Sequence, residues 1–295
     1  MVDRFAIYAD EANPERARSV LDSAEELSCG LRADESRLVR GLSVVILNQD
    51  HHELIVPLVE QLQGQRDAFR NAGLAFEVAI GDTGSASAEV HAAYARWEGL
   101  VTVVPDLPYH FSKCNNRVAR QATSGDSILF MNNDVALPER DDVLLSFYRS
   151  LRQSPGVGIL GAPLYFPDDT IQHLGIDFLR EPPLRGFPFH PHAHREISDV
   201  DLPAVYEAPA TTGAFLLIRR SLFDRIGGFV ENYEKECQDV DLCLQAHRLG
   251  YRTEVQNLGR TVHLENATRP KGEESWPDRR LFLRRWRSYV EAHFL

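Results

Sequence analysis

The segment SILFMNND, residues 127–134, joins an apolar run to three polar side chains without an intervening turn residue. Residues 128–131 are typical of a strand that is buried on both faces of a sheet. Asn132, Asn133 and Asp134 then stand where that strand ends. Two amides and a carboxylate at the mouth of a buried strand indicate a polar site at the edge of the core.

The chain before this segment alternates between strand and helix patterns. Apolar, β-branched runs at LSVVIL (42–47), FEVAI (76–80) and LVTVV (100–104) predict three further strands. Helical spacing of apolar residues separates them, and residues 111–123 predict a helix directly before the fourth strand. This alternation predicts right-handed βαβ units and a mostly parallel sheet that is covered by helices on both sides.

Polar residues also follow the first two predicted strands. Asn48 follows the first, and GDTGS (81–85), which contains Asp82, follows the second. Because ligands of parallel α/β sheets bind beyond the carboxyl ends of the strands, we expect these groups to meet at one edge. The sequence contains neither GxGxxG nor GxxxxGK[ST], so it predicts neither a Rossmann dinucleotide site nor a P-loop.

The second half of the chain is less regular. Residues 157–166 and 211–220 predict strands, and the segment 181–196 between them, rich in Pro and His, predicts a mobile loop. Residues 221–229 predict a short helix that a glycine pair ends. The segment CQDVDLCLQAHRLGY (237–251) predicts a longer helix.

Composition narrows the class of protein. Of 295 residues, 43% are hydrophobic and 25% are charged, which is typical of a globular protein. The formal net charge of −11 argues against a nucleic-acid partner, because phosphate backbones are bound by basic surfaces. No stretch approaches the about 18 consecutive apolar residues of a membrane helix. Four cysteines without CxxC or zinc-type spacing and an N-terminus unlike a signal peptide predict reduced thiols in a cytoplasmic protein.

We expect three parts. Residues 1–40 form an N-terminal extension with one helix over 12–27, residues 41–270 form the main domain, and residues 271–295 form a basic amphipathic helix. In that last helix Phe282, Trp286, Val290 and Phe294 are expected to pack on the domain. Its arginines permit attachment to an anionic membrane surface, which would place the protein at the inner face of the membrane.

Seven motifs in order resemble those of family-2 glycosyltransferases with the GT-A fold. They are ILNQD, GDTGSAS, CNNRVARQATSGDSILFMNND, GAPLYFPDDTIQHLG, TTGAFLLIRRSLFDRIGGF, CQDVDLCLQAHRLGYRTE and VHLENATR. The resemblance covers roughly residues 42–270 and is closest to the rhamnosyltransferase-like branch that builds bacterial surface polysaccharides. It implies one Rossmann-like domain and inverting transfer of a sugar from a UDP-, dTDP- or GDP-sugar to a hydroxyl of a saccharide or lipid-linked acceptor, with Mn²⁺ or Mg²⁺.

The resemblance also implies site residues. Asp134 ends the metal-binding DxD-type motif, here Asn132-Asn133-Asp134, and His263 in VHLENATR completes the metal site. A cation there would offset the charge of the leaving diphosphate. The alternatives are an aspartate that caps the following segment and a structural histidine.

Nucleotide binding is assigned to several residues by the same resemblance. Asp82 would accept hydrogen bonds from the nucleobase, with Asn48, Asn132 and Asn133 beside it. Arg269, between Thr268 and Lys271, lies on a segment that in the family orders over the donor, and the position of Arg117, on the helix before the fourth strand, also allows it to face the diphosphate. A turn aspartate and solvated surface charges, including Lys113, are the alternatives.

Asp239 is the candidate general base, because the reaction needs a carboxylate that removes the proton of the acceptor hydroxyl. The family's Glu-Asp pair maps onto Gln238-Asp239, so Gln238 is expected to contact the acceptor, and Gly213 belongs to the same site. Asp241 is expected to be structural, as an acid in the first turn of a helix.

Some features keep a structural interpretation, and two other functions stay open. HxHxH at His190, His192 and His194 lacks a metal-site geometry, and Gln172-His173 suits either the family motif or a hairpin contact. A non-catalytic nucleotide- or carbohydrate-binding module is the first alternative function, motivated by Gln238. A sugar-phosphate nucleotidyltransferase is the second, although NQDHHEL lacks the Gly-rich, basic loop that such enzymes need.

Overall fold

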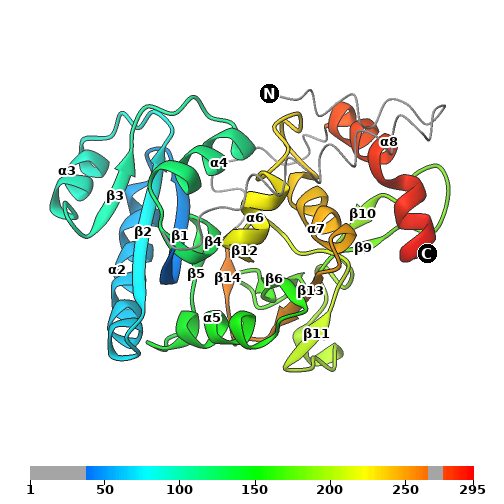
Figure 1. Ribbon diagram of the computed structural model, residues 1–295, viewed down its shortest axis with the longest axis horizontal. Helices are drawn as coiled ribbons and strands as arrows, with labels where there is room; N and C mark the ends of the chain where they lie inside the picture. The colour runs from blue at the N-terminus through cyan, green and yellow to red at the C-terminus, as the bar shows by residue number, and fades with distance from the viewer. Residues whose placement is uncertain (1–37, 265–274) are drawn as a thin grey trace. The chain divides into compact units, whose positions relative to one another are not determined.

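The computed structural model describes residues 38–264 and 275–295, which belong to one compact unit from Leu38 to Leu295 (Figure 1). The predicted helix over 12–27 lies outside the described residues. So do Thr268, Arg269 and Lys271.

An eight-stranded sheet forms the centre, in the order β11-β13-β6-β12-β4-β1-β2-β3. Its strands are β1 (Val39–Asn48), β2 (Ala75–Asp82), β3 (Val101–Val104), β4 (Gly125–Asn132), β6 (Val157–Gly161), β11 (Val205–Glu207), β12 (Phe215–Arg219) and β13 (Arg252–Gln256). β4, β1, β2 and β3 are parallel neighbours, as are β6 and β13. β12 is antiparallel to β4 and β6, and β11 is antiparallel to β13. The prediction of a mostly parallel α/β sheet is confirmed.

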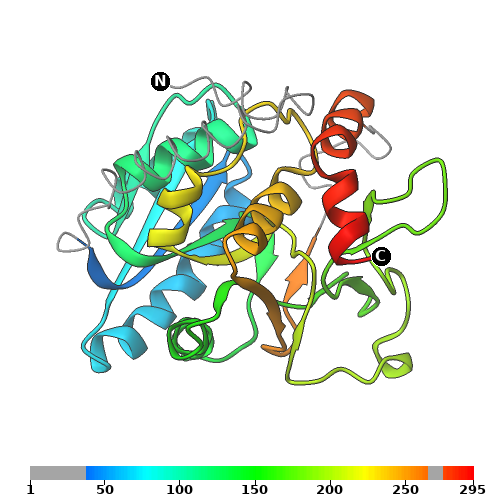
Figure 2. The ribbon, with the colours of Figure 1, turned by 45° about the vertical axis from the view of Figure 1, so that its right-hand side comes forward.

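Helices cover both faces of this sheet (Figures 1 and 2). α2 (His52–Asn71) and α5 (Val143–Gln153) contribute to one core, with α3 (Ala88–Arg96) at its margin. α4 (Phe111–Gln121), α6 (Arg220–Ile226), α7 (Gln238–Arg248) and α8 (Trp276–His293) contribute to the other. Alternate residues of β4 serve the two cores, with Leu129 and Met131 in the first and Ile128 and Phe130 in the second. This is why the strand is apolar throughout.

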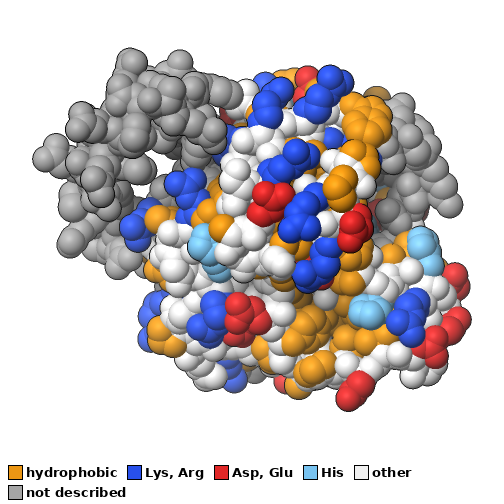
Figure 3. Space-filling view, turned by 90° about the vertical axis from the view of Figure 1, so that its right-hand side faces the viewer, with side chains coloured by type: hydrophobic (Ala, Val, Ile, Leu, Met, Phe, Trp, Pro, Cys, Tyr) orange, Lys and Arg blue, Asp and Glu red, His pale blue; other side chains and the backbone are white. Residues whose placement is uncertain are grey.

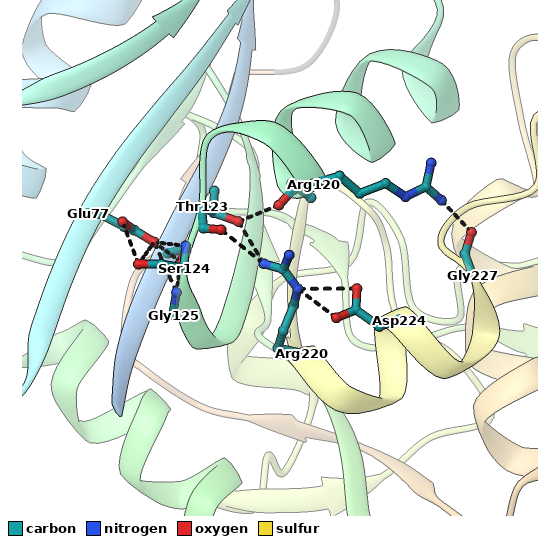
Figure 4. Close-up of polar contacts among 10 residues, drawn as sticks. Glu77, Arg120, Thr123, Ser124, Gly125, Arg220, Asp224 and Gly227 are labelled. Carbon is teal, nitrogen blue, oxygen red and sulfur yellow. Dashed lines mark hydrogen bonds and ion pairs between the residues drawn. The ribbon is translucent and has the colours of Figure 1, made fainter. Parts of the chain in front are cut away.

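Polar contacts fix the beginning of β4, at the end of the sheet away from Asp134 (Figure 4). The Glu77 carboxylate of β2 accepts the backbone N–H groups of Ser124 and Gly125. Arg220 at the start of α6 donates to Asp224 (2.9 Å) and to the Thr123 hydroxyl (2.9 Å). These contacts anchor the loop between α4 and β4, and so they set the point at which β4 starts.

A second, four-stranded sheet lies beyond the carboxyl end of β4. It has the order β5-β14-β7-β8, from β5 (Val135–Ala136), β14 (Val262–His263), β7 (Leu164–Tyr165) and β8 (Ile171–His173). The prediction of a single strand over 157–166 is wrong: the chain leaves the central sheet at Gly161 and enters the small one at Leu164. Pro163 separates the two strands, and proline has no N–H with which to continue a ladder.

The segment 181–196 is folded where a mobile loop was predicted. It carries β10 (Pro188–Phe189), which pairs with β9 (Asp177–Phe178) and precedes the 3₁₀ helix η2 (Ile197–Asp199). Buried Phe187 anchors it, with its ring centre 6.2 Å from that of Phe282 in α8.

The apolar face of α8 packs on the domain as expected, since Phe282, Trp286 and Val290 are buried. Among the described helices none is long and apolar enough to cross a membrane.

Candidate functional site

A cavity of about 700 Å³ opens at the carboxyl ends of β1 and β4. These two strands are neighbours, and the chain proceeds from β1 to one side as β2 and β3 and then returns to the other side as β4. Ligands of α/β sheets bind at such a reversal of strand order. The cavity is also lined by residues of β10, the turn 212–214, the start of α7 and His263.

Asp134 and His263 meet through the small sheet. Asp134 directly precedes β5, and His263 lies opposite Val135 in the antiparallel pair of β5 and β14. His263 Nε2 is 3.1 Å from Asp134 Oδ1. Asp134 is buried, and its Oδ1 has no hydrogen-bond partner among the described residues. The pair therefore sits at the wall of the cavity with an unsatisfied carboxylate oxygen.

Gln172 of β8 sets the orientation of the His263 ring. Its Oε1 accepts the Nδ1–H of His263 at 2.6 Å, and its Nε2 donates to the His263 backbone oxygen at 3.2 Å. With the proton on Nδ1, Nε2 of His263 accepts the side-chain N–H of Asn132 at 3.2 Å and lies beside Asp134 Oδ1. The sequence analysis allowed either a family motif or a hairpin contact for Gln172, and in the structure Gln172 orients His263.

These two atoms suit a divalent cation. Asp134 Oδ1 accepts no hydrogen bond, and the Nε2 lone pair of His263, 3.1 Å away, would bind a cation in place of the Asn132 amide. Nowhere in the described part of the chain do three or more His, Cys, Asp or Glu side chains form a group that could hold a metal. The donor set therefore fits a cation that takes its other ligands from substrate oxygens and water.

A chain of amides and hydroxyls links the predicted nucleotide residues. Asn133 Nδ2 donates to Asn48 Oδ1 (2.8 Å), and Asn48 Nδ2 donates to the Tyr94 hydroxyl (3.0 Å). The Tyr94 hydroxyl in turn donates to Asp82 Oδ2 at 2.8 Å. Asn48, Asn132 and Asn133 line the cavity. Tyr94, on α3, was not predicted to belong to the site.

Asp82 is engaged inside its own turn. Its Oδ1 accepts the N–H groups of Gly84 (3.0 Å) and Ser85 (2.9 Å), and its Oδ2 accepts the hydroxyls of Ser85 and Tyr94. Burial raises the pKa of this carboxyl, but the hydrogen bonds together outweigh burial and the pKa is lowered. Thr83, not Asp82, is among the residues that line the cavity.

Asp239 lies in the first turn of α7 and faces the cavity. Its Oδ2 accepts the Gly213 N–H at 2.8 Å, and its Oδ1 accepts the Val240 N–H at 2.9 Å. Gly213 is packed closely, because a Cβ there would lie 3.0 Å from Phe111 Cζ and 3.4 Å from Asp239 Cβ. The carboxylate is thus held in one orientation by the backbone.

Gln238, beside Asp239, is 6% exposed and lines the cavity. Its Oε1 is buried without a hydrogen-bond partner among the described residues. Because an unsatisfied buried acceptor is costly, this oxygen is suited to a donor from a ligand.

Asp241 is structural, as predicted, but in a different way. It is fully buried and accepts the Tyr233 hydroxyl (2.9 Å), the Trp286 indole N–H (2.6 Å) and the Arg285 guanidinium (2.8 Å). The group ties α8 to α7. Its main contribution is therefore this buried network rather than the helix dipole.

The remaining predicted residues are dispersed. Arg117 and Lys113 are exposed, and Arg117 donates to Gln121 on its own helix at 3.2 Å. His194 stacks on Phe166 and His192 contacts Arg195. His190, by contrast, lines the cavity and contacts His173, so the three histidines face different partners.

Two cations that the sequence did not assign to the site line the cavity. They are Lys235, before α7, and Arg279, one of the arginines of α8 that were considered for membrane attachment. Arg279 Nε donates to Glu236 at 2.9 Å, and its guanidinium lies 4.9 Å from the centre of the Phe187 ring.

Three of the four cysteines lie among the described residues, and all three, Cys114, Cys237 and Cys243, are buried free thiols.

The architecture is the GT-A fold of glycosyltransferases, which solved structures share. The mannosyltransferase PcManGT of Pyrobaculum calidifontis, in complex with GDP-Man and Mn²⁺, is 17% identical, with a TM-score of 0.55 over 92% of this chain and 71% of its own. GalNAc-T7 with UDP, GalNAc and Mn²⁺ is 14% identical, with a TM-score of 0.57 over 88% of this chain and 49% of its own. S. aureus TarS 1–349 is 14% identical, with a TM-score of 0.51 over 76% of this chain and 60% of its own. At these identities the likeness shows the fold.

Two relatives are similar in sequence. The uncharacterized protein y4gI of Sinorhizobium fredii is 32% identical over 260 residues, 86% of this chain and 27% of that protein. The O-antigen biosynthesis protein RfbC of Myxococcus xanthus is 30% identical over 241 residues, 78% of this chain and 18% of that protein. The chain thus spans about a quarter or less of the length of these relatives. No known protein-family profile matches it.

Proposed function

We propose that this chain is an inverting, metal-dependent glycosyltransferase of the family-2 type. It would move a sugar from a UDP-, dTDP- or GDP-sugar to a hydroxyl of a saccharide or lipid-linked acceptor in bacterial polysaccharide synthesis. One observation carries the proposal: the Asp134–His263 pair and the Asp239 carboxylate line the same cavity of a GT-A fold. The similarity to RfbC supports the polysaccharide role.

In this proposal Asp239 acts as the general base. Its carboxylate takes the proton of the acceptor hydroxyl while the hydroxyl oxygen bonds to the anomeric carbon and the bond to the diphosphate oxygen breaks. The Gly213 N–H holds Asp239 in place for this step. Since Asp239 Oδ1 and Oδ2 each accept one backbone N–H, lone pairs remain for the incoming proton.

The donor would bind at the ends of β1 and β4. A divalent cation held by Asp134 and His263 would supply positive charge opposite the departing diphosphate. Asn48, Asn132 and Asn133 offer amide groups to the nucleotide, and Asp82 shapes the turn that brings Thr83 to the cavity. Arg269 stays a candidate diphosphate ligand outside the described residues.

Thermal unfolding with UDP, GDP or dTDP, with and without Mn²⁺, tests the proposal, because a ligand of the native state raises the melting temperature. One nucleotide should raise it further when Mn²⁺ is present. Asp134→Ala should lose the Mn²⁺-dependent part. Asp239→Asn should keep the full shift and lose transfer about 10²- to 10⁴-fold. Asp142→Ala, at an exposed residue that is not part of the cavity lining, is the control.

Two results would contradict this assignment. If Asp239→Asn transferred sugar at the wild-type rate, the base would be another group. A nucleotide that binds with Mn²⁺ and is never consumed, with any sugar donor or acceptor, would instead indicate a non-catalytic binding module.

Peripheral membrane contact through α8 is a separate part of the proposal. Arg279 and Arg285 are turned inward, whereas Arg280, Arg284 and Arg287 are exposed. Lys and Arg side chains gather on the face that carries α8, with hydrophobic side chains among them (Figure 3). This combination suits an anionic lipid surface, which would bring the protein to a lipid-linked acceptor.

A further inference from the structure

His173 is a buried histidine whose ring is surrounded by hydrogen-bond donors. It is 1% exposed, and its Nε2 lies 3.2 Å from the Gly175 backbone nitrogen, 3.4 Å from that of Thr212 and 3.0 Å from the Thr211 hydroxyl. Backbone N–H groups can only donate, so Nε2 of His173 is the acceptor and carries no proton. The ring proton of His173 is therefore on Nδ1. Burial, with His190 and His263 nearby, also lowers the pKa of His173 well below its usual value, which keeps the ring neutral at pH 7.

The tautomer of His173 determines that of His190. The Nδ1 atoms of the two rings are 2.9 Å apart. A hydrogen bond between two nitrogens contains one proton, and His173 supplies it, so Nδ1 of His190 accepts. A neutral His190 then has its own proton on Nε2, at the far side of the ring. A run of hydrogen bonds from the backbone of residues 175 and 212 thus fixes the direction in which His190 can donate.

His190 and Asp239 belong to the same side of the cavity. Both line it, and the turn at residues 211–213 contacts Asp239 directly and His190 through His173. Thr211 and Thr212 contact the His173 ring, while the N–H of Gly213 holds Asp239 at 2.8 Å. Gln172, the neighbour of His173 on β8, contacts His263 instead. Successive residues of a strand point to opposite faces. Gln172 therefore contacts His263 of the metal pair, while His173 contacts His190.

We propose that His190 binds the acceptor saccharide by donating its Nε2–H to a sugar hydroxyl, and that His173 is the residue that positions it. The inference rests on the proposed function, because the hydroxyl that must reach Asp239 is the acceptor's. Phe189, the preceding residue, also lines the cavity and is 36% exposed. It offers an apolar ring to the C–H face of the same sugar.

Two substitutions of His190 separate its two nitrogens. His190→Asn places an amide oxygen near the position of Nδ1, so His173 keeps an acceptor, while the outer donor is lost. His190→Gln places an amide N–H near the position of Nε2, so the outer donor is retained. His192→Asn is the matched control, because His192 is an exposed histidine of the same segment that contacts Arg195.

The probes are p-nitrophenyl glycosides of common hexoses as acceptors, with UDP-, GDP- and dTDP-sugars as donors. For the glycoside that the wild type glycosylates fastest, His190→Asn should raise the acceptor KM about tenfold, the effect of one hydrogen bond. His190→Gln should raise it less, and His192→Asn should not change it. The melting-temperature shift with nucleotide and Mn²⁺ should stay at the wild-type value in all three. If His190→Asn loses that shift, or keeps the wild-type KM, the inference is overturned.

NMR of ¹⁵N-histidine-labelled protein at pH 7 tests the arrangement without any acceptor. His173 should carry its proton on Nδ1, and His190 should carry a proton on Nε2 and none on Nδ1. A His190 that is protonated on Nδ1 or doubly protonated would overturn the inference. If the wild type binds nucleotide and Mn²⁺ but consumes no sugar donor with any acceptor, the proposed function fails, while the tautomers still decide whether His190 presents its donor.

Discussion

His263 Nε2 lies 3.1 Å from Asp134 Oδ1, although one residue follows β4 and the other ends β14. The antiparallel pairing of β5 with β14 creates this contact, and Gln172 completes it by accepting the Nδ1–H of His263. Ligand orientation in the proposed metal site therefore depends on a glutamine from a third strand.

Gln172→Leu should weaken Mn²⁺ binding about 10- to 100-fold, as expected for the loss of an outer-shell partner of a histidine ligand. Gln172→Glu retains an acceptor for Nδ1–H and should keep most of the affinity. Electron paramagnetic resonance of free Mn²⁺, titrated with protein and UDP, measures this directly. Gln121→Leu, at an exposed glutamine of α4, is the control. Equal affinity in Gln172→Leu and wild type would remove Gln172 from the site.

Gly213→Ala should impair transfer and leave nucleotide binding intact. The added Cβ would be 3.0 Å from Phe111 Cζ and 3.4 Å from Asp239 Cβ, so either the Phe111 ring or the turn that holds Asp239 must shift. We expect kcat to fall at least tenfold, because small displacements of a base have large effects on rate. Gly64→Ala, at an exposed position in the middle of α2, should keep full activity and raise the free energy of unfolding by about 0.5–1 kcal/mol. A fully active Gly213→Ala would show that the close packing at this turn does not position the base.

Asp241→Ala should lower the free energy of unfolding by about 3–5 kcal/mol, because it leaves Arg285 without its buried partner. It also leaves the Trp286 N–H and the Tyr233 hydroxyl unsatisfied. Urea unfolding followed by tryptophan fluorescence gives the value. Asp142→Ala, which removes an exposed pair with Arg140, should change stability by no more than about 1 kcal/mol. A similar small effect of Asp241→Ala would mean that α8 is held mainly by its apolar face.

Asp82 should make stability depend on acid pH. Its pKa in the folded protein is below the ordinary value of 3.8, so the ionised carboxylate stabilises the native state. The stabilisation by the Asp82 carboxylate is complete above pH 3.8 and is lost as the pH falls through the lower pKa of the folded state. Melting temperatures between pH 2 and 7 should show Asp82→Asn less stable than wild type near neutrality, with a gap that narrows below pH 3.8. A gap independent of pH would contradict the role of the charge.

Replacing three exposed arginines of α8 should reduce binding to anionic vesicles. The triple change Arg280→Gln, Arg284→Gln and Arg287→Gln removes about 1 kcal/mol of attraction per residue, or about two orders of magnitude in affinity. Sedimentation with phosphatidylglycerol vesicles, compared with phosphatidylcholine, measures it. The control changes three arginines of α2 and α5, namely Arg66, Arg70 and Arg149. Wild-type protein that stays in the supernatant with both lipids would remove the membrane contact from the proposal.

The central sheet was predictable because its strands carry strong local patterns. β1 and β4 contain the apolar runs Val44–Leu47 and Ile128–Met131, which are covered by helices on both faces of the sheet. Their polar ends, Asn48 and Asn132 to Asp134, could be placed at one edge of the sheet, since parallel strands share an edge. α7 was predictable in the same way, with Asp239 in its first turn.

The small sheet was not predictable from its own segments. β5, β7 and β14 have two residues each, too few to show a period of two. The inward turn of Arg279 was also hidden, because a helical pattern gives the apolar face of α8 but not the partners that Glu236 and Phe187 provide. The contact of Gln172 with His263 was hidden as well, because no local sequence pattern shows that these two distant segments pair.

The sequence alone determined the alternation of strands and helices, the edge at which polar groups gather, and Asp239 at the head of a helix, because hydrophobic periodicity and strand ends are local properties. Tertiary structure decided which oxygen of Asp134 meets His263, which histidine reaches the cavity, and which acid holds α8. Those outcomes depend on hydrogen-bond geometry between strands and helices that are distant in the chain, and the burial that enforces it exists only once the sheets have formed.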